Sequence, residues 1–132
     1  MNGLRVYYED TDAAGIVYYA NYLKFAERAR TEFLRSLGGE HRAMKDALGV
    51  SFVVRSVSAD YDRPARLDDE LAVRTSLTKL GGASMTMTQN VECEARTLVK
   101  MSVRLACVGE GGKPVRMPAE LRAALHSFQQ AR

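Results

Sequence analysis

Two carboxylates near the start of the chain could do chemistry, in the segment Glu9-Asp10-Thr11-Asp12-Ala13-Ala14-Gly15. Several tyrosines follow this segment, and then comes a long amphipathic stretch that predicts a helix. A carboxylate can act as a general base or as a nucleophile, and the first turn of a helix has backbone N–H groups that can bind an oxyanion. An acid next to a helix N-terminus therefore suits acyl transfer, in which a carbonyl carbon is attacked and its oxygen becomes negative.

The same residue types also occur for structural reasons. Asp and Thr are favoured in turns and helix caps, where their side chains bond nearby backbone groups. On spacing alone, such a role is the favoured interpretation of Asp10, Thr11 and Asp12, and catalysis is the alternative. The rings of Tyr18 and Tyr22 are interpreted as packing residues, although one of them could line an acyl pocket.

Composition limits the class of protein. The chain has 132 residues, which is enough for one compact domain with a real core. Its net charge of +3 is mild, and Arg and Lys are scattered among Asp and Glu, so nucleic acid is not expected as a partner. Cys93 and Cys107 fall on apolar faces of predicted strands and are interpreted as reduced core thiols, with the cytosol as default compartment. His41 and His126 lack ligand-like spacing, so no metal site is expected, nor is a membrane span or signal peptide.

The elements that must position the acids are predicted by hydrophobic periodicity. Apolar residues recur with helical spacing over residues 20–37, which predicts one long helix. Gly38 and Gly39 are expected to end it, and residues 40–48 predict a shorter amphipathic piece. A terminal helix is expected to begin at Pro118, because proline is favoured in the first helical turn.

Alternation of apolar and polar residues predicts strands at residues 4–9, 51–61, 71–78, 84–95 and 99–107. Gly81 and Gly82 would supply the positive φ of a tight hairpin. Five strands with one apolar face must cover something, and the long helix is the available partner. The expected class is α+β, with an antiparallel five-stranded sheet wrapped around one long central helix. Such a small sheet leaves an exposed edge strand, which favours the pairing of two copies.

A family resemblance is visible in the run Arg5-Val6-Tyr7-Tyr8-Glu9-Asp10-Thr11-Asp12-Ala13-Ala14-Gly15-Ile16-Val17-Tyr18-Tyr19-Ala20-Asn21-Tyr22, with Phe25, Glu27, Ala29 and Arg30 behind it. These residues closely resemble the hot-dog-fold acyl-CoA thioesterases. The nearest branch is similar to the Tol–Pal-associated acyl-CoA thioesterases, alongside the 4-hydroxybenzoyl-CoA thioesterases. The segment Tyr61-Asp62-Arg63-Pro64-Ala65-Arg66-Leu67-Asp68-Asp69 is similar to a Tyr-x-x-Pro-Ala-x-x-Asp-Asp turn of the family.

The resemblance implies a single hot-dog thioesterase domain over residues 1–132 that hydrolyses the thioester of a short-chain or aromatic acyl-CoA. By this resemblance Asp12 is the catalytic carboxylate, as general base or nucleophile, and Asp10 is left as a turn or capping residue. The backbone N–H at Tyr19 would be the oxyanion contact. Many members of the Tol–Pal branch have His where this chain has Tyr19, so an imidazole acid or base is not expected here. Gly15, Tyr22 and Arg63 are expected to bind substrate.

Two alternatives to this function remain open at this point. One is a narrower aryl-CoA thioesterase of the 4-hydroxybenzoyl type, and the other is a non-hydrolytic module that binds an acyl carrier or an envelope partner. No cofactor is expected, because the coenzyme A thioester is itself the substrate. Acyl carrier protein is the other carrier to consider. The expected assembly is a homodimer or homotetramer in the cytoplasm, with peripheral attachment to the inner membrane left open.

Overall fold

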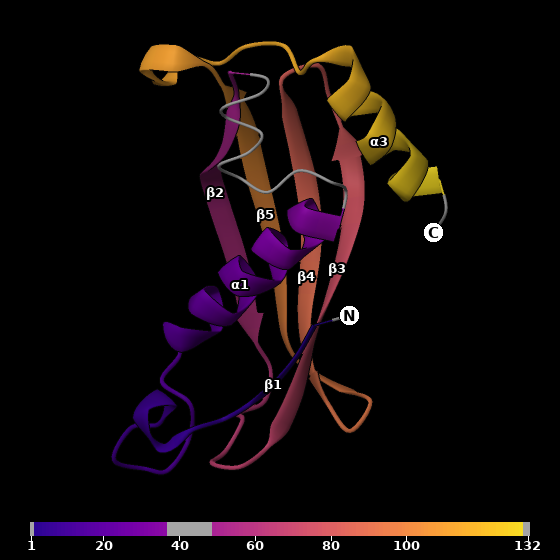
Figure 1. The fold of residues 1–132 in the computed structure, drawn as a ribbon. Coiled ribbons are helices and arrows are strands. Elements are labelled where there is room, and N and C mark those ends of the chain that lie inside the picture. Colours follow the sequence, from indigo (N-terminus) through magenta and orange to yellow (C-terminus); the bar gives the residue numbers. More distant parts are fainter. Residues whose placement is uncertain (1, 37–48, 131–132) are drawn as a thin grey trace.

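The computed structural model describes residues 2–36 and 49–130 of the chain (Figure 1). Within these residues the structure has one long helix, one C-terminal helix and five strands. Their bounds are β1 (Asn2–Arg5), α1 (Asn21–Ser36), β2 (Ser51–Tyr61), β3 (Glu70–Leu80), β4 (Ser84–Cys93), β5 (Arg96–Val108) and α3 (Ala119–Gln130). Short 3-10 turns lie at Tyr8–Asp10 and Glu110–Gly112. No helix in these residues is long and apolar enough to cross a membrane.

The five strands form one sheet in the order β1-β3-β4-β5-β2, and each neighbouring pair is antiparallel. Helix α1 runs diagonally across one face of this sheet (Figure 1). The loop between β1 and α1 lies at one end of the sheet, and α3 lies beside β3 towards the other end. The α+β class and the five-stranded antiparallel sheet packed on a long helix are therefore confirmed.

The core lies between α1 and the sheet. Strand β4 alternates buried and partly buried residues along its length, as its sequence pattern predicts. Much of this layer comes from α1, β4 and β5: Phe25, Ala26, Ala29, Phe33, Met85, Met87, Gln89, Val91, Val99, Met101, Val103, Leu105 and Cys107. Strand β3 adds Leu71, Val73 and Leu77. Burying an aliphatic or aromatic side chain stabilises the fold by roughly 1.5–3 kcal/mol, so this layer fixes α1 on the sheet. Burial raises the pKa of both cysteine thiols, and both are free.

Helix α1 begins at Asn21, one residue after its predicted start, and is helical to Ser36, the last residue described before residues 37–48. Its buried side is Tyr22, Phe25, Ala26, Ala29, Phe33 and Leu34. The opposite side, with Lys24, Arg28, Thr31 and Arg35, is exposed. Phe33 also packs edge-on against Phe128 of α3, with ring centroids 4.4 Å apart. The expected glycine stop at Gly38 and Gly39, and the expected piece at residues 40–48, lie outside the described residues.

Three local predictions were wrong. The first strand ends at Arg5 rather than at residue 9, because the Tyr7 N–H bonds the Asp10 carboxylate at 2.9 Å and the chain turns there. The β3–β4 turn has no positive φ at its glycines; a β-carbon on Gly82 would lie 3.3 Å from the Arg116 guanidinium, so that glycine provides space. Helix α3 begins at Ala119, one residue later than expected.

Candidate active site

The two expected acids lie in the loop between β1 and α1, which folds into a short hairpin. Thr11 pairs with Val17 in an antiparallel bridge, and the Asp12 N–H donates to the Ile16 carbonyl at 2.9 Å. The Gly15 N–H donates back to the Asp12 carbonyl at 3.0 Å. Gly15 has a φ of +79°, a left-handed conformation that residues with a β-carbon adopt only at a cost. The sequence therefore folds this way locally because glycine stands at the turn position.

The Asp12 side chain is exposed at the start of that hairpin. One of its oxygens, Oδ1, accepts a hydrogen bond from the Ala14 N–H at 2.8 Å, which fixes the carboxylate against its own turn. In the described part of the chain, the other oxygen has neither a hydrogen bond nor an ion pair. The carboxylate is thus oriented and still has an oxygen available for a reactant.

Asp10 is placed differently and has a structural part in the loop. Its carboxylate accepts the Tyr7 N–H at 2.9 Å. Its backbone carbonyl accepts two further hydrogen bonds, from the Tyr18 N–H at 3.0 Å and from the Asn21 side-chain amide at 2.9 Å. Asp10 therefore fixes the approach of the chain to α1, in agreement with its interpretation as a turn residue.

The first turn of α1 leaves a backbone donor free near these acids. The carbonyls of Tyr18, Tyr19 and Ala20 accept the first hydrogen bonds of the helical turn, at 2.8, 3.3 and 3.2 Å. Within residues 2–36 and 49–130, the Tyr19 N–H donates to no acceptor. Such a donor at the positive end of a helix dipole can hold a developing negative charge.

A second loop, residues 62–69, lies against the Asp12 hairpin. The carbonyl of Ala65 accepts the Val17 N–H at 2.8 Å, and Ile16 pairs with Arg66 in an antiparallel bridge. The Ala65 N–H in turn donates to the Tyr22 hydroxyl at 2.9 Å. Sequence reasoning assigned no role to Ala65; the signal that could have found it was the second stretch of family resemblance.

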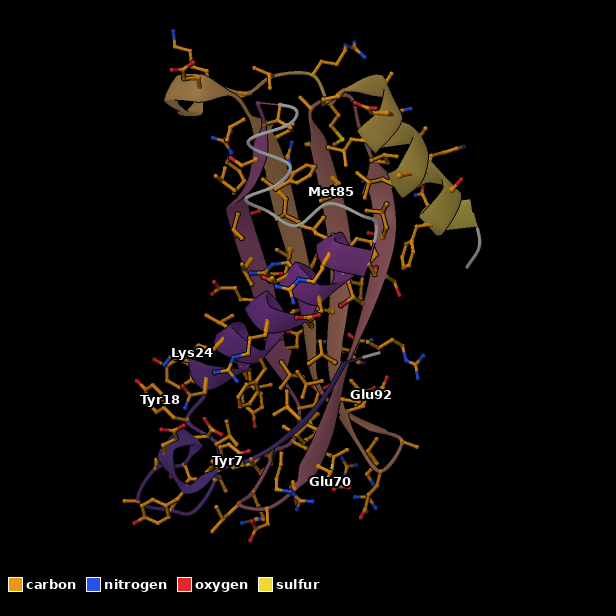
Figure 2. All side chains as sticks on the ribbon, viewed as in Figure 1. Tyr7, Tyr18, Lys24, Glu70, Met85 and Glu92 are labelled. Carbon is orange, nitrogen blue, oxygen red and sulfur yellow. The ribbon has the colours of Figure 1, made fainter. Side chains whose placement is uncertain are left out.

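The tyrosines form a connected group where α1 begins. The rings of Tyr18 and Tyr19 have centroids 4.8 Å apart, and Tyr61 at the end of β2 lies 6.0 Å from Tyr19 and 5.8 Å from Tyr22. Tyr18, Tyr19 and Tyr61 are exposed, and Figure 2 shows Tyr18 near the start of α1. Tyr22 is only 3% exposed, and burial raises the pKa of its hydroxyl.

The expected site residues are thus brought together on two adjoining segments. Asp12, Gly15, Tyr19 and Tyr22 lie on the hairpin and the start of α1, and Arg63 lies on the adjacent loop, where it is exposed. The Arg63 N–H is anchored to the Leu98 carbonyl at 3.1 Å. In the ranges that the structure describes, no three His, Cys, Asp or Glu side chains are grouped to hold a metal ion.

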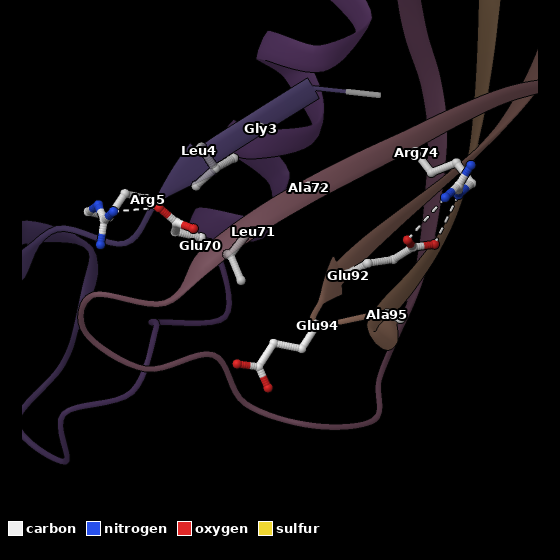
Figure 3. Close-up of a pocket in the computed structure, with 10 residues that line it drawn as sticks. All are labelled: Gly3, Leu4, Arg5, Glu70, Leu71, Ala72, Arg74, Glu92, Glu94 and Ala95. Atoms are coloured by element: carbon white, nitrogen blue, oxygen red, sulfur yellow. Dashed lines mark hydrogen bonds and ion pairs between the residues drawn. The ribbon is translucent and has the colours of Figure 1, made fainter.

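A separate depression of about 610 Å³ lies at β1, β3 and the β4–β5 turn (Figure 3). Its charged rim includes the ion pair of Arg5 with Glu70 and that of Arg74 with Glu92, the latter with atoms 3.1 Å apart. None of the expected site residues lines it. Four of its five charged residues are paired in these two ion pairs, and Glu94 is the fifth. We therefore take the Asp12 loop, and not this depression, as the candidate active site.

Fold and loop together define an α+β domain with an exposed, oriented carboxylate, that of Asp12, on the loop that leads into a long helix. Residues 14–100 match the family model of the Thioesterase superfamily. The acyl-CoA thioesterase YbgC of Haemophilus influenzae is 44% identical over 127 residues, which are 96% of this chain and 93% of that protein. The chain belongs to the thioesterase superfamily, and its sheet with the long helix α1 is the hot-dog fold.

Solved structures agree with this assignment. A probable thioesterase from Bartonella henselae has a TM-score of 0.84 and 39% identity, over 88% of this chain and 96% of that one. The gentisyl-coenzyme A thioesterase BH1999 has a TM-score of 0.86 and 25% identity, over 96% of this chain and 99% of that one.

Proposed function

We propose that this chain hydrolyses acyl-CoA thioesters, with Asp12 as general base or nucleophile and the Tyr19 backbone N–H as oxyanion donor. The observation that supports this most directly is that one short segment contains both a free acceptor and a free donor. The Asp12 carboxylate has an oxygen without a partner, and the Tyr19 N–H has no acceptor in the described ranges. The names of the similar proteins supply the substrate class.

Two chemical routes fit this arrangement. As a base, Asp12 takes a proton from water while the water oxygen adds to the thioester carbonyl; collapse of the oxyanion then expels the thiolate, which receives the proton. As a nucleophile, Asp12 adds directly and expels the thiolate, and water opens the resulting mixed anhydride. In both routes the Tyr19 N–H stabilises the oxyanion, and one such donor typically lowers the barrier by about 3 kcal/mol. Water is the second reactant, so neither route needs a cofactor.

The proposal also assigns substrate contacts to Gly15, Arg63 and Tyr22. Gly15 is exposed at the turn, and a β-carbon there would meet nothing within 4 Å, so the backbone is open to a ligand. The Arg63 guanidinium has no ion-pair partner in the described residues and could meet a phosphate of the carrier. The Tyr22 ring would form an inner wall, since its hydroxyl is already bonded to Ala65.

A second copy of the chain is the proposed partner that completes the site. Strand β2 is a sheet edge of 11 residues, and three valines on it are exposed: Val53, Val54 and Val57. A long apolar edge of this kind favours pairing with another strand. Tyr61 lies on the same edge and contacts the ring of Tyr19, so a paired copy would stand beside the Asp12 hairpin.

An aromatic acyl group is the alternative substrate class, and a specific observation favours it. The exposed rings of Tyr18, Tyr19 and Tyr61 lie beside the Asp12 hairpin, where they could stack on an aryl ring. The similar BH1999 protein is a gentisyl-coenzyme A thioesterase. A released-thiol assay over short-chain, long-chain and aromatic acyl-CoAs would distinguish aliphatic from aromatic substrates by their kcat/KM.

The substitution Asp12→Asn tests the central proposal. It removes the base and nucleophile but keeps the size and the hydrogen bond to Ala14, so we expect kcat to fall by about 10²–10⁴-fold. Binding of a non-hydrolysable thioether analogue, measured by calorimetry, should remain within about threefold because the carboxylate is not expected to bind the carrier. The matched control is Asp10→Asn, which should retain most activity. Full hydrolysis by the Asp12→Asn protein would reject Asp12 as the catalytic group.

A further inference from the structure

The backbone of Ala65 connects the two halves of the proposed active site. Ala65 is fully buried. Its carbonyl accepts the Val17 N–H at 2.8 Å, and its N–H donates to the Tyr22 hydroxyl at 2.9 Å. Val17 belongs to the hairpin that holds Asp12, whereas Tyr22 belongs to the first turn of α1. One residue from a distant part of the sequence therefore joins the acid-bearing loop to the helix.

The loop that contains Ala65 is itself held firmly to the sheet. At its start, the Arg63 N–H donates to the Leu98 carbonyl of β5 at 3.1 Å. At its end, the Asp69 carboxylate accepts the Arg66 N–H at 2.9 Å, and the Asp69 carbonyl accepts the Val6 N–H at 2.9 Å. Because both ends of the loop are fixed by hydrogen bonds, Ala65 is held in place. It can therefore position the two residues that hydrogen-bond to it, Val17 and Tyr22.

The groups that must cooperate in thioester cleavage lie on either side of this point. Asp12 follows Thr11, which pairs with Val17, and so the Ala65 carbonyl restrains the hairpin that holds the carboxylate. Tyr19 lies just before Tyr22, whose hydroxyl is tied to the Ala65 N–H. The separation of the Asp12 carboxylate from the Tyr19 N–H therefore depends on both bonds of Ala65.

We propose that Tyr22 is a positioning residue, whose hydroxyl acts through Ala65 to set the Asp12 carboxylate and the Tyr19 N–H at the spacing that the reaction needs. This inference rests on the proposed function. Without the hydroxyl, the Ala65 N–H would be buried with no acceptor, and the loop would have to shift to relieve it. Small displacements of reacting groups can cost about 10²-fold in rate, so such a shift would be visible in kcat.

The test is Tyr22→Phe compared with Thr75→Val. Each change removes a hydroxyl that accepts a hydrogen bond. The Thr75 hydroxyl of β3 is partly buried and accepts from the Gln89 side chain at 3.1 Å, away from the Asp12 loop. At a temperature where both proteins are folded, we expect Tyr22→Phe to lower kcat by about 10–100-fold with KM within about twofold. Thr75→Val should keep kcat within about twofold of the parent.

Amide hydrogen exchange gives a second readout that does not depend on catalysis. In Tyr22→Phe the Val17 amide should exchange faster, because its acceptor on Ala65 is loosened, while the Val91 amide in β4 should be unchanged. In Thr75→Val the Val17 amide should exchange at the parent rate. If Tyr22→Phe is too unstable to assay, Ala65→Gly makes the same backbone more flexible, so the two hydrogen bonds of residue 65 no longer hold Val17 and Tyr22 at a fixed separation, and it should lower kcat severalfold at constant KM.

Unchanged kcat in folded Tyr22→Phe would overturn the inference, as would a rise in KM at constant kcat, which would make Tyr22 a substrate contact only. Equal losses of kcat in Tyr22→Phe and Thr75→Val would also overturn it, because the effect would then be general. Failure of the proposed function is separate: it would appear as full hydrolysis by Asp12→Asn, whatever the exchange rate at Val17.

Discussion

Glu94 and Ala95 make the tight turn between β4 and β5 at φ values of 50° and 66°. For residues with a β-carbon the left-handed conformation is less stable by roughly 1–2 kcal/mol, and turns of this kind prefer Asn or Gly. Both residues are exposed and lie beside the depression of Figure 3, not beside Asp12. The conformation is therefore imposed by strand pairing on either side, since Cys93 is opposite Arg96.

The substitution Ala95→Gly should raise the free energy of unfolding by about 1 kcal/mol, because glycine removes the strain at this φ. Urea unfolding measures the change, and kcat should be unaffected. Ala123→Gly in the exposed side of α3 is the control and should lower stability by about 1 kcal/mol. A loss of stability in Ala95→Gly would contradict the strain argument.

At the scale of elements, α1 is fixed on the sheet by one polar cluster within an apolar layer. Gln89 of β4 is fully buried, and its amide donates to the Ala26 carbonyl of α1 at 2.9 Å. Its oxygen accepts the Arg30 guanidinium at 2.8 Å. Burial lowers the pKa of Arg30 from its ordinary value. Because the oxygen and the amide of Gln89 both have hydrogen-bond partners on α1, the cluster fixes the position of α1 along β4.

Breaking half of this cluster should be worse than removing all of it. Gln89→Met leaves the Arg30 guanidinium without its acceptor, and we expect a loss of about 1–3 kcal/mol in the free energy of unfolding. The double variant Gln89→Met with Arg30→Met should recover much of that loss, because no partly buried charge is left without its hydrogen-bond partner. A double-mutant cycle by urea unfolding measures the coupling. Simple additivity of the two changes would contradict the cluster.

On the scale of the whole molecule, charge is unevenly distributed along the sheet. In the Asp12 hairpin and the adjacent loop of residues 62–69, acids outnumber the cations Arg63 and Arg66: Glu9, Asp10, Asp12, Asp62, Asp68 and Asp69. Near the β3–β4 turn are four cations without an ion pair in the described residues: Lys79, Arg104, Arg116 and Arg122. Antiparallel pairing of two β2 edges would bring the acidic end of one copy towards the basic end of the other, which favours the proposed dimer.

The double substitution Val54→Lys with Val57→Lys tests this assembly. Two charges on the β2 edge should prevent strand pairing, so the protein should sediment as a monomer while staying folded. Because the site is proposed to need the second copy, kcat/KM should fall by at least about tenfold. Thr31→Lys, on the exposed side of α1, is the control and should change neither mass nor activity. A folded monomer with full activity would refute the shared site.

Much of this arrangement could be predicted from the sequence alone. Residues 51–61 were predicted as a strand, and β2 has those bounds; residues 20–37 were predicted as a helix, and α1 runs from Asn21 to Ser36. Both follow from periodicity, because a residue's burial repeats with the geometry of its own element. The Asp12 segment was found in another way, by its resemblance to a family motif, which a sequence can show because the acids, the glycine and the helix start are neighbours in the chain.

Tertiary structure decided the features that depend on contacts between distant residues. The first strand ends at Arg5 because Arg5 is paired with Glu70, the first residue of its partner strand β3, so no further β3 residue is available to extend the pairing. The bond of Tyr22 to Ala65 joins segments that no local pattern relates. Sequence therefore determined which elements form and which acid stands beside the helix. Only the folded chain determined how these are held together, because backbone hydrogen bonds between loops leave no periodic trace in side-chain type.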